Sequence, residues 1–169
     1  MTAYISPEYV YSFLSGPDIV QSKEDAWEIG INCISLAHLA LKDLYDYELP
    51  RELMCAELYA DREHFIPLED GEAMMVGDLV WFGIEDPEVQ VHEFVPHYEN
   101  GSLINWADFP VKHVAIFTGE YADGDPLLLH STSIVGTNVV WPLSYFKTYR
   151  RYRQLYGVTR LIGAAEISS

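Results

Sequence analysis

Three side chains of this sequence are of types that can carry out nucleophilic catalysis: Cys33, His113 and His130. Cys33 opens a segment whose apolar residues recur at helical spacing, so we place it at a helix N-terminus. The free N–H groups and partial positive charge of such a terminus favour thiolate over thiol. Most lone cysteines in proteins are nevertheless buried and inert, so a reactive Cys33 requires a base.

His113 and His130 can supply the two other groups that cysteine catalysis needs. One imidazole exchanges a proton with the thiol and the leaving group, and a third polar group orients that imidazole. His113 begins a predicted strand over 113–117, and His130 ends the next one over 127–130. If these strands are antiparallel neighbours, both histidines lie at one end of the sheet. A helix N-terminus at that end would bring Cys33 to His113.

The first third of the chain has the pattern of helices. Ser6-Pro7-Glu8 and a following apolar stripe predict a short helix that stops at Gly16-Pro17. Ser22 can cap a turn that carries Trp27. Apolar residues at three- and four-residue spacing predict helices over 33–45 and 50–63.

After Gly71 the pattern changes to short, aromatic and β-branched runs separated by turn residues. We expect strands over 77–83, 89–95, 113–117, 127–130, 138–141 and 158–162, with a helical turn over 142–149. Helices followed by a run of antiparallel strands indicate an α+β domain, with the N-terminal helices packed on one face of an antiparallel β-sheet. The length of 169 residues fits one domain over 1–169.

The net charge of −16 excludes some classes of partner. It argues against nucleic acid, whose binding depends on basic side chains, and against an anionic membrane surface. We see no signal peptide and no membrane span, and two cysteines make a disulfide framework implausible. We therefore expect a cytoplasmic protein without a cofactor, and export without a cleaved leader stays open.

Half of the basic side chains lie in residues 147–169, where Glu166 is the only acid. The basic residues are Lys147, Arg150, Arg151, Arg153 and Arg160. We interpret them as a solvated face that pairs with acids elsewhere in the domain. Cys55 is expected in the core, and His38 and His64 on the solvent-facing sides of helices.

The stretch over about 85–112 is longer than a tight connection between strands and reads as an insertion. It is rich in aromatic residues, Trp106 among them, and either covers a cleft or forms a decorated surface loop. His92, Glu93 and His97 lack the His-Glu-x-x-His spacing of a zinc site, so we expect no metal.

Four short runs resemble the motifs of the NlpC/P60 cysteine peptidases, a family of the papain-like superfamily. Residues 32–36 resemble its Asp-Cys-Ser-Gly-Phe motif, 76–82 its Pro-Gly-Asp-Leu-Val-Phe-Phe strand, 112–117 its His-Val-Gly-Ile-Tyr strand, and 128–131 its Phe-Ile-His-Ala run. The resemblance extends from about residue 27 to 146. It implies a papain-like fold with Cys33 as nucleophile, His113 as base and His130 as the orienting residue.

The resemblance also implies where substrate binds. In the family, the residues on either side of the cysteine help bind the stem peptide of peptidoglycan and complete the oxyanion hole; here they are Asn32 and Ile34. The apolar Ile34 lacks the hydrogen-bond donor of the family's serine. We also expect the aromatic side chains of Trp27 and Trp106 to contact substrate.

Three functions remain in competition at this point. The leading one is hydrolysis of an amide or isopeptide bond, most naturally in a peptidoglycan-type stem peptide, through an acyl-enzyme on Cys33. The second is an acyltransferase on the same scaffold, acting on a small molecule or a non-wall peptide. The third is a binding module without turnover, which the presence of all three of Cys33, His113 and His130 argues against.

Overall fold

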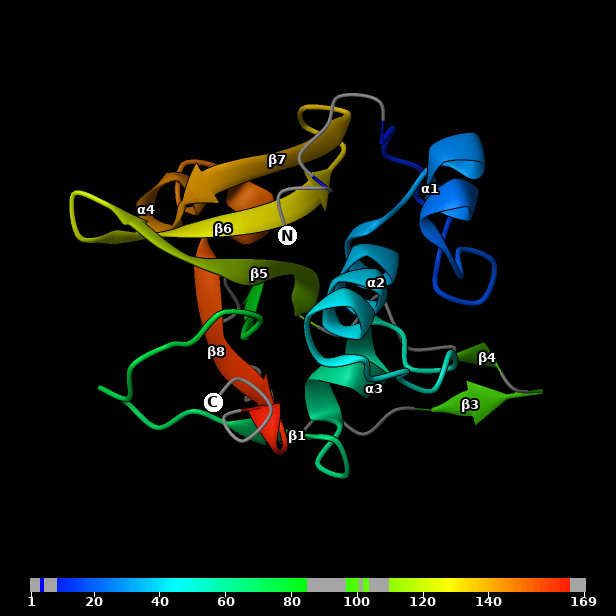
Figure 1. The fold of residues 1–169 in the computed structure, drawn as a ribbon, viewed down its shortest axis with the longest axis horizontal. Coiled ribbons are helices and arrows are strands. Elements are labelled where there is room, and N and C mark those ends of the chain that lie inside the picture. Colours follow the sequence, from blue (N-terminus) through cyan, green and yellow to red (C-terminus); the bar gives the residue numbers. More distant parts are fainter. Residues whose placement is uncertain (1–3, 5–8, 85–96, 101, 104–109, 165–169) are drawn as a thin grey trace.

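A computed structural model describes residues 4, 9–84, 97–100, 102–103 and 110–164 of the chain. Its centre is a six-stranded sheet in the order β1-β8-β2-β5-β6-β7, in which every pair of neighbours is antiparallel (Figure 1). The strands are β1 (Phe65–Pro67), β2 (Leu79–Gly83), β5 (Val111–Ala122), β6 (Asp125–Thr132), β7 (Thr137–Pro142) and β8 (Gln154–Leu161), with a separate hairpin of β3 (Tyr98–Glu99) and β4 (Ser102–Leu103). The predicted α+β class and antiparallel sheet are confirmed.

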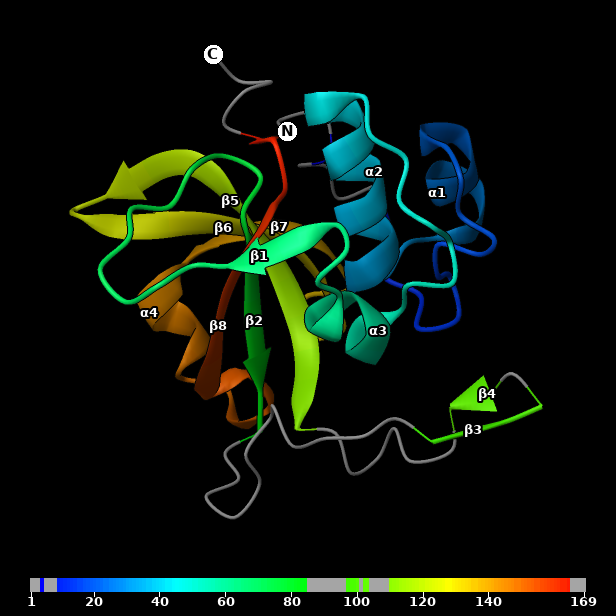
Figure 2. The same ribbon diagram turned by 90° about the horizontal axis from the view of Figure 1, so that it is seen from below.

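Helices lie on both sides of this sheet. They are α1 (Lys23–Ile29), α2 (Cys33–Tyr45), α3 (Cys55–Ala60), α4 (Leu143–Phe146) and the 3-10 helix η4 (Arg150–Tyr152). Helices α2 and α3 pack on one face, and α1 lies outside α2, farther from the strands (Figures 1 and 2). The expected covering of one face by N-terminal helices is therefore present, and the short α4 contacts the sheet through β6 and β7.

Helix α2 has the limits that its sequence predicts. Asn32 caps its N-terminus, and Ser35 completes a capping box by accepting a hydrogen bond from the Asn32 N–H (3.0 Å). Asp46 ends the helix in the left-handed conformation (φ 52°), and its N–H donates to Lys42 O (2.9 Å). The helix is buried on more sides than an amphipathic pattern predicts. Since His38 is buried and hydrogen-bonded to Leu53 O (3.0 Å), the prediction that it faces solvent is wrong.

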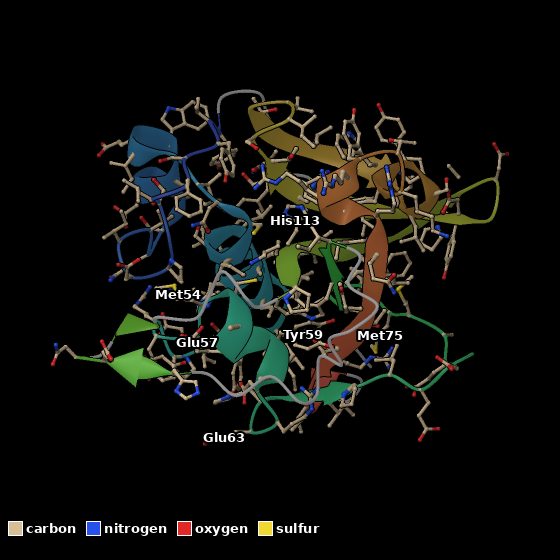
Figure 3. All side chains as sticks on the ribbon, turned by 180° about the vertical axis from the view of Figure 1, so that it is seen from behind. Met54, Glu57, Tyr59, Glu63, Met75 and His113 are labelled. Carbon is tan, nitrogen blue, oxygen red and sulfur yellow. The ribbon has the colours of Figure 1, made fainter. Side chains whose placement is uncertain are left out.

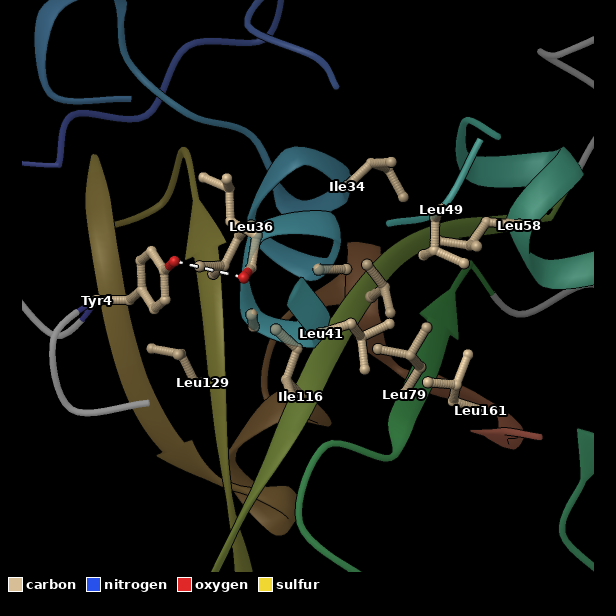
Figure 4. Close-up of a cluster of buried hydrophobic side chains, with 14 of the residues drawn as sticks. Tyr4, Ile34, Leu36, Leu41, Leu49, Leu58, Leu79, Ile116, Leu129 and Leu161 are labelled. Carbon is tan, nitrogen blue, oxygen red and sulfur yellow. Dashed lines mark hydrogen bonds between the residues drawn. The ribbon is translucent and has the colours of Figure 1, made fainter. Parts of the chain in front are cut away.

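The alternation of side chains along the strands divides the core into two layers. One layer joins the sheet to α2 and α3 through side chains that include Leu36, Leu41, Leu58, Leu79, Ile116 and Leu129 (Figure 4). The other layer lies on the opposite face and contains Val80, Phe82, Ala115, Phe117, Leu128, Trp141, Phe146 and Tyr152. Leu79 and Val80, adjacent in β2, thus belong to different layers, so the strand is buried on both faces.

Two predicted helices differ from the structure. In the described part of the predicted helix over 7–14, Val10 bridges to Thr137 and Tyr11 to Ile31, and residues 13–14 form a turn. Tertiary pairing with β7 and with the residue before Asn32 therefore overrides the local helical signal. The predicted helix over 50–63 is reduced to the six residues of α3. The predicted strand over 89–95 and most of the 85–112 insertion lie outside the described residues.

Candidate active site

The two candidate histidines meet on neighbouring strands. His113 comes from β5 and His130 from β6, and their Nε2 and Nδ1 atoms lie 2.7 Å apart in a buried hydrogen bond. Their side chains are only 4% and 0% exposed. Figure 3 shows His113 in the interior of the molecule. The two imidazoles, 17 residues apart in sequence, therefore meet at the same end of two neighbouring strands, beyond the Ile116 and Leu129 pair.

Cys33 reaches this pair because the N-terminus of α2 lies where β5 and β6 separate. The paired positions of these strands run from Ala122 and Asp125 to Ile116 and Leu129. Beyond them the Val114 N–H donates toward the Cys33 sulfur. Cys33 and His113 line one pocket of about 250 Å³, so a single ligand can contact both.

Asn32 positions the cysteine as the helix cap. Its Oδ1 accepts hydrogen bonds from the N–H groups of Ile34 (3.0 Å) and Ser35 (2.9 Å), and its Nδ2 donates to Phe13 O (3.2 Å). Asn32 and Ile34, predicted to contact substrate, both line the pocket. The side-chain amide of Asn32 is nevertheless hydrogen-bonded within the protein. Of the two residues, Ile34 therefore offers a ligand only an apolar side chain.

The other predicted contacts lie elsewhere. Trp27 is 52% exposed and packs edge-on against Tyr9, on a surface hollow separate from the pocket of Cys33. Trp106 lies outside the described residues. Cys55 packs against the core, as predicted, but it also lines the same pocket as Cys33, and its Sγ donates to Val111 O (3.6 Å). Both cysteines are free thiols.

Burial sets the protonation states of the candidate groups. Burial raises the pKa of the Cys33 thiol, although N–H groups of Val114, Cys33 and Ile34 oppose the shift. Burial, with His130 contributing, lowers the pKa of His113 well below its usual value, and burial lowers the pKa of His130 to about 3. The expected fall in the pKa of Cys33 at the helix N-terminus is thus outweighed by desolvation. The resting pair is a neutral thiol and a neutral imidazole.

Aromatic rings around His130 favour one tautomer of the pair. Its Nε2 is buried without a hydrogen-bond partner among the described residues, and its ring lies 4.4 Å from that of Trp141 and 4.6 Å from that of Phe146. An N–H packs better against aromatic rings than a lone pair does. We therefore assign the proton of His130 to Nε2, so that its Nδ1 accepts the hydrogen bond from the His113 Nε2–H. This arrangement leaves His113 Nδ1 unprotonated, as a base requires.

Sequence reasoning missed the contribution of η4. Tyr152 stacks on the His113 ring, with centroids 4.3 Å apart at 22°, and its hydroxyl shares a hydrogen bond with Thr132 Oγ1 (2.7 Å). The adjacent Arg151 lines the pocket. The excess of basic residues after position 146 was the sequence signal that could have indicated Arg151. The predicted pairing of these residues with acids is found for Arg160, which contacts Asp78 at 2.8 Å.

No group of three or more metal-ligating side chains occurs within the described parts of the chain. In those same parts no helix has the length and apolar character needed to cross a membrane. No protein-family model matches this chain, and a search of curated proteins finds no significant match.

Proposed function

We propose that this protein is a cysteine hydrolase that cleaves an amide or isopeptide bond through Cys33, His113 and His130. One observation carries the proposal. Cys33 shares a pocket with His113, and the Nε2 atom of His113 is hydrogen-bonded to Nδ1 of the buried His130 at 2.7 Å. A nucleophile, a base and a group that orients the base are the three components of such sites.

The reaction begins from the neutral pair. As the Cys33 sulfur attacks the substrate carbonyl carbon, His113 Nδ1 accepts the thiol proton and the imidazolium forms. His130, a neutral acceptor at Nδ1, stabilises the new charge through the existing hydrogen bond. His113 then donates the proton to the leaving amine, which departs as the thioester forms. Water adds to the thioester with His113 as base and releases the acid.

The backbone at the start of α2 supplies one donor for the oxyanion. The N–H groups of Cys33 and Ile34 both act on the Cys33 sulfur, but the Ile34 N–H also donates to the Asn32 cap, which leaves the Cys33 N–H as the donor for the oxyanion. When the sulfur attacks a carbonyl carbon, the oxygen on that carbon lies within reach of the Cys33 N–H and at the positive end of the helix.

The order of these elements supports a papain-like fold of the NlpC/P60 type. A cysteine at the N-terminus of a central helix, followed by antiparallel strands that carry the two histidines, agrees with the resemblance of the sequence motifs. We accordingly propose a peptidoglycan-type stem peptide as the substrate, met in the cytoplasm as a recycled fragment.

Acyl transfer is the second candidate, and the lining of the pocket favours it. Phe13, Ile34 and Met54 give the pocket an apolar side next to Cys33. Such a wall disfavours ordered water and suits an amine or alcohol as the acyl acceptor. The chemistry up to the thioester is the same in both cases.

The test is to incubate the protein with purified muropeptides and to read product masses, with and without added amine acceptors. We expect release of a free amine, a thioester adduct that peptide mapping places on Cys33, and loss of both with Cys33→Ala. Since general acid–base catalysis contributes about 10²- to 10⁴-fold, His113→Ala should slow turnover by that factor.

His97→Asn serves as the matched histidine control, because His97 is exposed and does not line the pocket. Products that contain the added amine would assign the transferase. Equal turnover by the wild-type and Cys33→Ala proteins, or no thioester on Cys33 with any muropeptide, would overturn the proposal.

A further inference from the structure

The sign of the charge in the pocket is opposite to that of the molecule. The chain has 26 acidic and 10 basic side chains. Among the described residues, however, none that lines the pocket is acidic, and two are cationic, Lys112 and Arg151. A protein of net charge −16 repels anions at long range, so it needs a local cation to hold one.

Arg151 is available to a ligand. It is exposed, and its Nη1 donates to Ser133 Oγ at 3.3 Å, a neutral partner that also lines the pocket. Within the described part of the chain Arg151 forms no salt bridge with a carboxylate, unlike Arg160. A guanidinium that keeps its fork of donors free binds a carboxylate through two parallel hydrogen bonds.

The position of Arg151 in the fold directs it at the reacting groups. It precedes Tyr152, whose ring stacks on His113, and it lines the pocket that Cys33 and His113 also line. The positive charge of Arg151 opposes the rise in the pKa of Cys33 that burial causes, and it adds to the fall in the pKa of His113. Ile34, which follows Cys33 and lines the same pocket, has no polar side-chain group that could bind an anion in place of Arg151.

We propose that Arg151 is a specificity-determining residue that binds a carboxylate carried by the acyl donor beside the scissile amide. The substrate class is therefore an anionic amide, such as one built on a dicarboxylic amino acid, and the neutral analogue is a poor substrate. The role of Arg151 in substrate specificity rests on the proposed function, whereas the binding of an anion by Arg151 does not depend on it.

The experiment measures binding without turnover first. N-acetylglutamate and its diamide are titrated into the Cys33→Ala protein and followed by the NMR signals of the pocket residues. We expect the anion to bind about tenfold to a hundredfold more tightly than the diamide, as for a charge-assisted, bidentate contact. Arg151→Gln should abolish this preference, and Arg151→Lys should restore part of it.

Arg153→Gln is the matched control, because Arg153 is an exposed arginine two residues away that does not line the pocket. It should keep the full preference. Turnover gives a second measurement, the ratio of kcat/KM for an anionic amide to kcat/KM for its neutral analogue. This ratio should be lower in Arg151→Gln than in the wild-type enzyme by the same factor.

The outcomes separate the two proposals. An anion preference that depends on Arg151, without turnover of any amide, would refute the hydrolase and keep the binding site. Turnover with equal kcat/KM for the anionic and neutral substrates, or an anion preference that survives in Arg151→Gln, would overturn the role of Arg151.

Discussion

His130 is fully buried, and this burial disfavours the charged form of its imidazole. Trp141 and Phe146 pack against its ring, and among the described residues the only hydrogen-bond partner of its imidazole is His113. A histidine that stays neutral can accept a hydrogen bond from a neighbouring imidazolium without adding a second positive charge. In the proposed mechanism, burial thus suits His130 to orient His113 rather than to compete with it as a base.

Replacement of Trp141 should change the tautomer of the histidine pair. We expect Trp141→Leu to weaken the preference of His130 for a proton on Nε2, because the aromatic neighbour of that N–H is lost. Turnover should fall about twofold to fivefold, the factor that corresponds to one weak N–H–π contact. Trp141→Phe, which keeps a ring, should restore most of it.

Imidazole ¹⁵N chemical shifts at neutral pH provide the measurement. In the wild-type protein both histidines should carry their protons on Nε2, and the Trp141→Leu protein should show a mixture. A proton on His113 Nδ1 in the wild-type protein would contradict the assignment and remove the base from the mechanism.

At the scale of elements, α2 determines where the thiol lies. At its N-terminus the Val114 N–H of β5 donates toward the Cys33 sulfur, and the cap formed by Asn32 holds the first turn of the helix. The same cap joins α2 to the preceding segment through the hydrogen bond to Phe13 O. Helix stability and the geometry of the nucleophile are therefore coupled through one side chain.

Asn32→Ala should lower both stability and activity. The loss of an N-cap costs about 1 kcal/mol in the free energy of unfolding, or about 2–4 °C in Tm for a chain of this size. Urea denaturation with the folded fraction followed by circular dichroism provides the measurement. Asn32→Asp keeps an oxygen acceptor for the Ile34 and Ser35 N–H groups and should retain most of the stability.

The same pair of variants tests the coupling to catalysis. Because Asn32→Ala frees the first turn of α2, turnover at a temperature where the protein is fully folded should fall by more than the loss of folded protein explains. Unchanged kcat/KM in a folded Asn32→Ala protein would show that the cap does not position Cys33.

At the scale of the whole molecule, two neutral histidines inside the core make folding sensitive to acid. An unfolded histidine binds a proton near pH 6.5, whereas His130 in the folded protein does so only near pH 3. Between these values the unfolded state binds more protons. Stability that is complete above pH 6.5 is therefore lost as the pH falls toward 3.

Chemical denaturation at a series of pH values should show this loss. His130 alone contributes a slope of about 1.4 kcal/mol per pH unit within the window, added to the titration of the acidic residues. His130→Asn should have a shallower slope by about that amount, and His97→Asn, an exposed control, should not.

An independent readout keeps this prediction testable if His130→Asn fails to fold. The imidazole NMR signals of His130 in the wild-type protein should not titrate between pH 7.5 and 5. A titration midpoint near 6.5 would contradict the burial argument.

Local sequence signals determined much of the fold. Asn32 and the apolar spacing after it predicted the limits of α2, and glycine-bounded aromatic and β-branched runs predicted most of the described strands. These signals succeed because caps, turns and periodicity act between residues a few positions apart. They also indicated Cys33, His113 and His130 as candidate residues before any distance was known.

Only the tertiary structure decided how these groups are tuned. It replaced the predicted helix over 7–14, where described, by two β-bridges and a turn, buried His38, and brought Arg151 and Cys55 to the pocket of Cys33. It also reversed the expected direction of the pKa shift at Cys33. Strand pairing and desolvation depend on neighbours far away in sequence, so a pattern along the chain can indicate a nucleophile but cannot determine its protonation state.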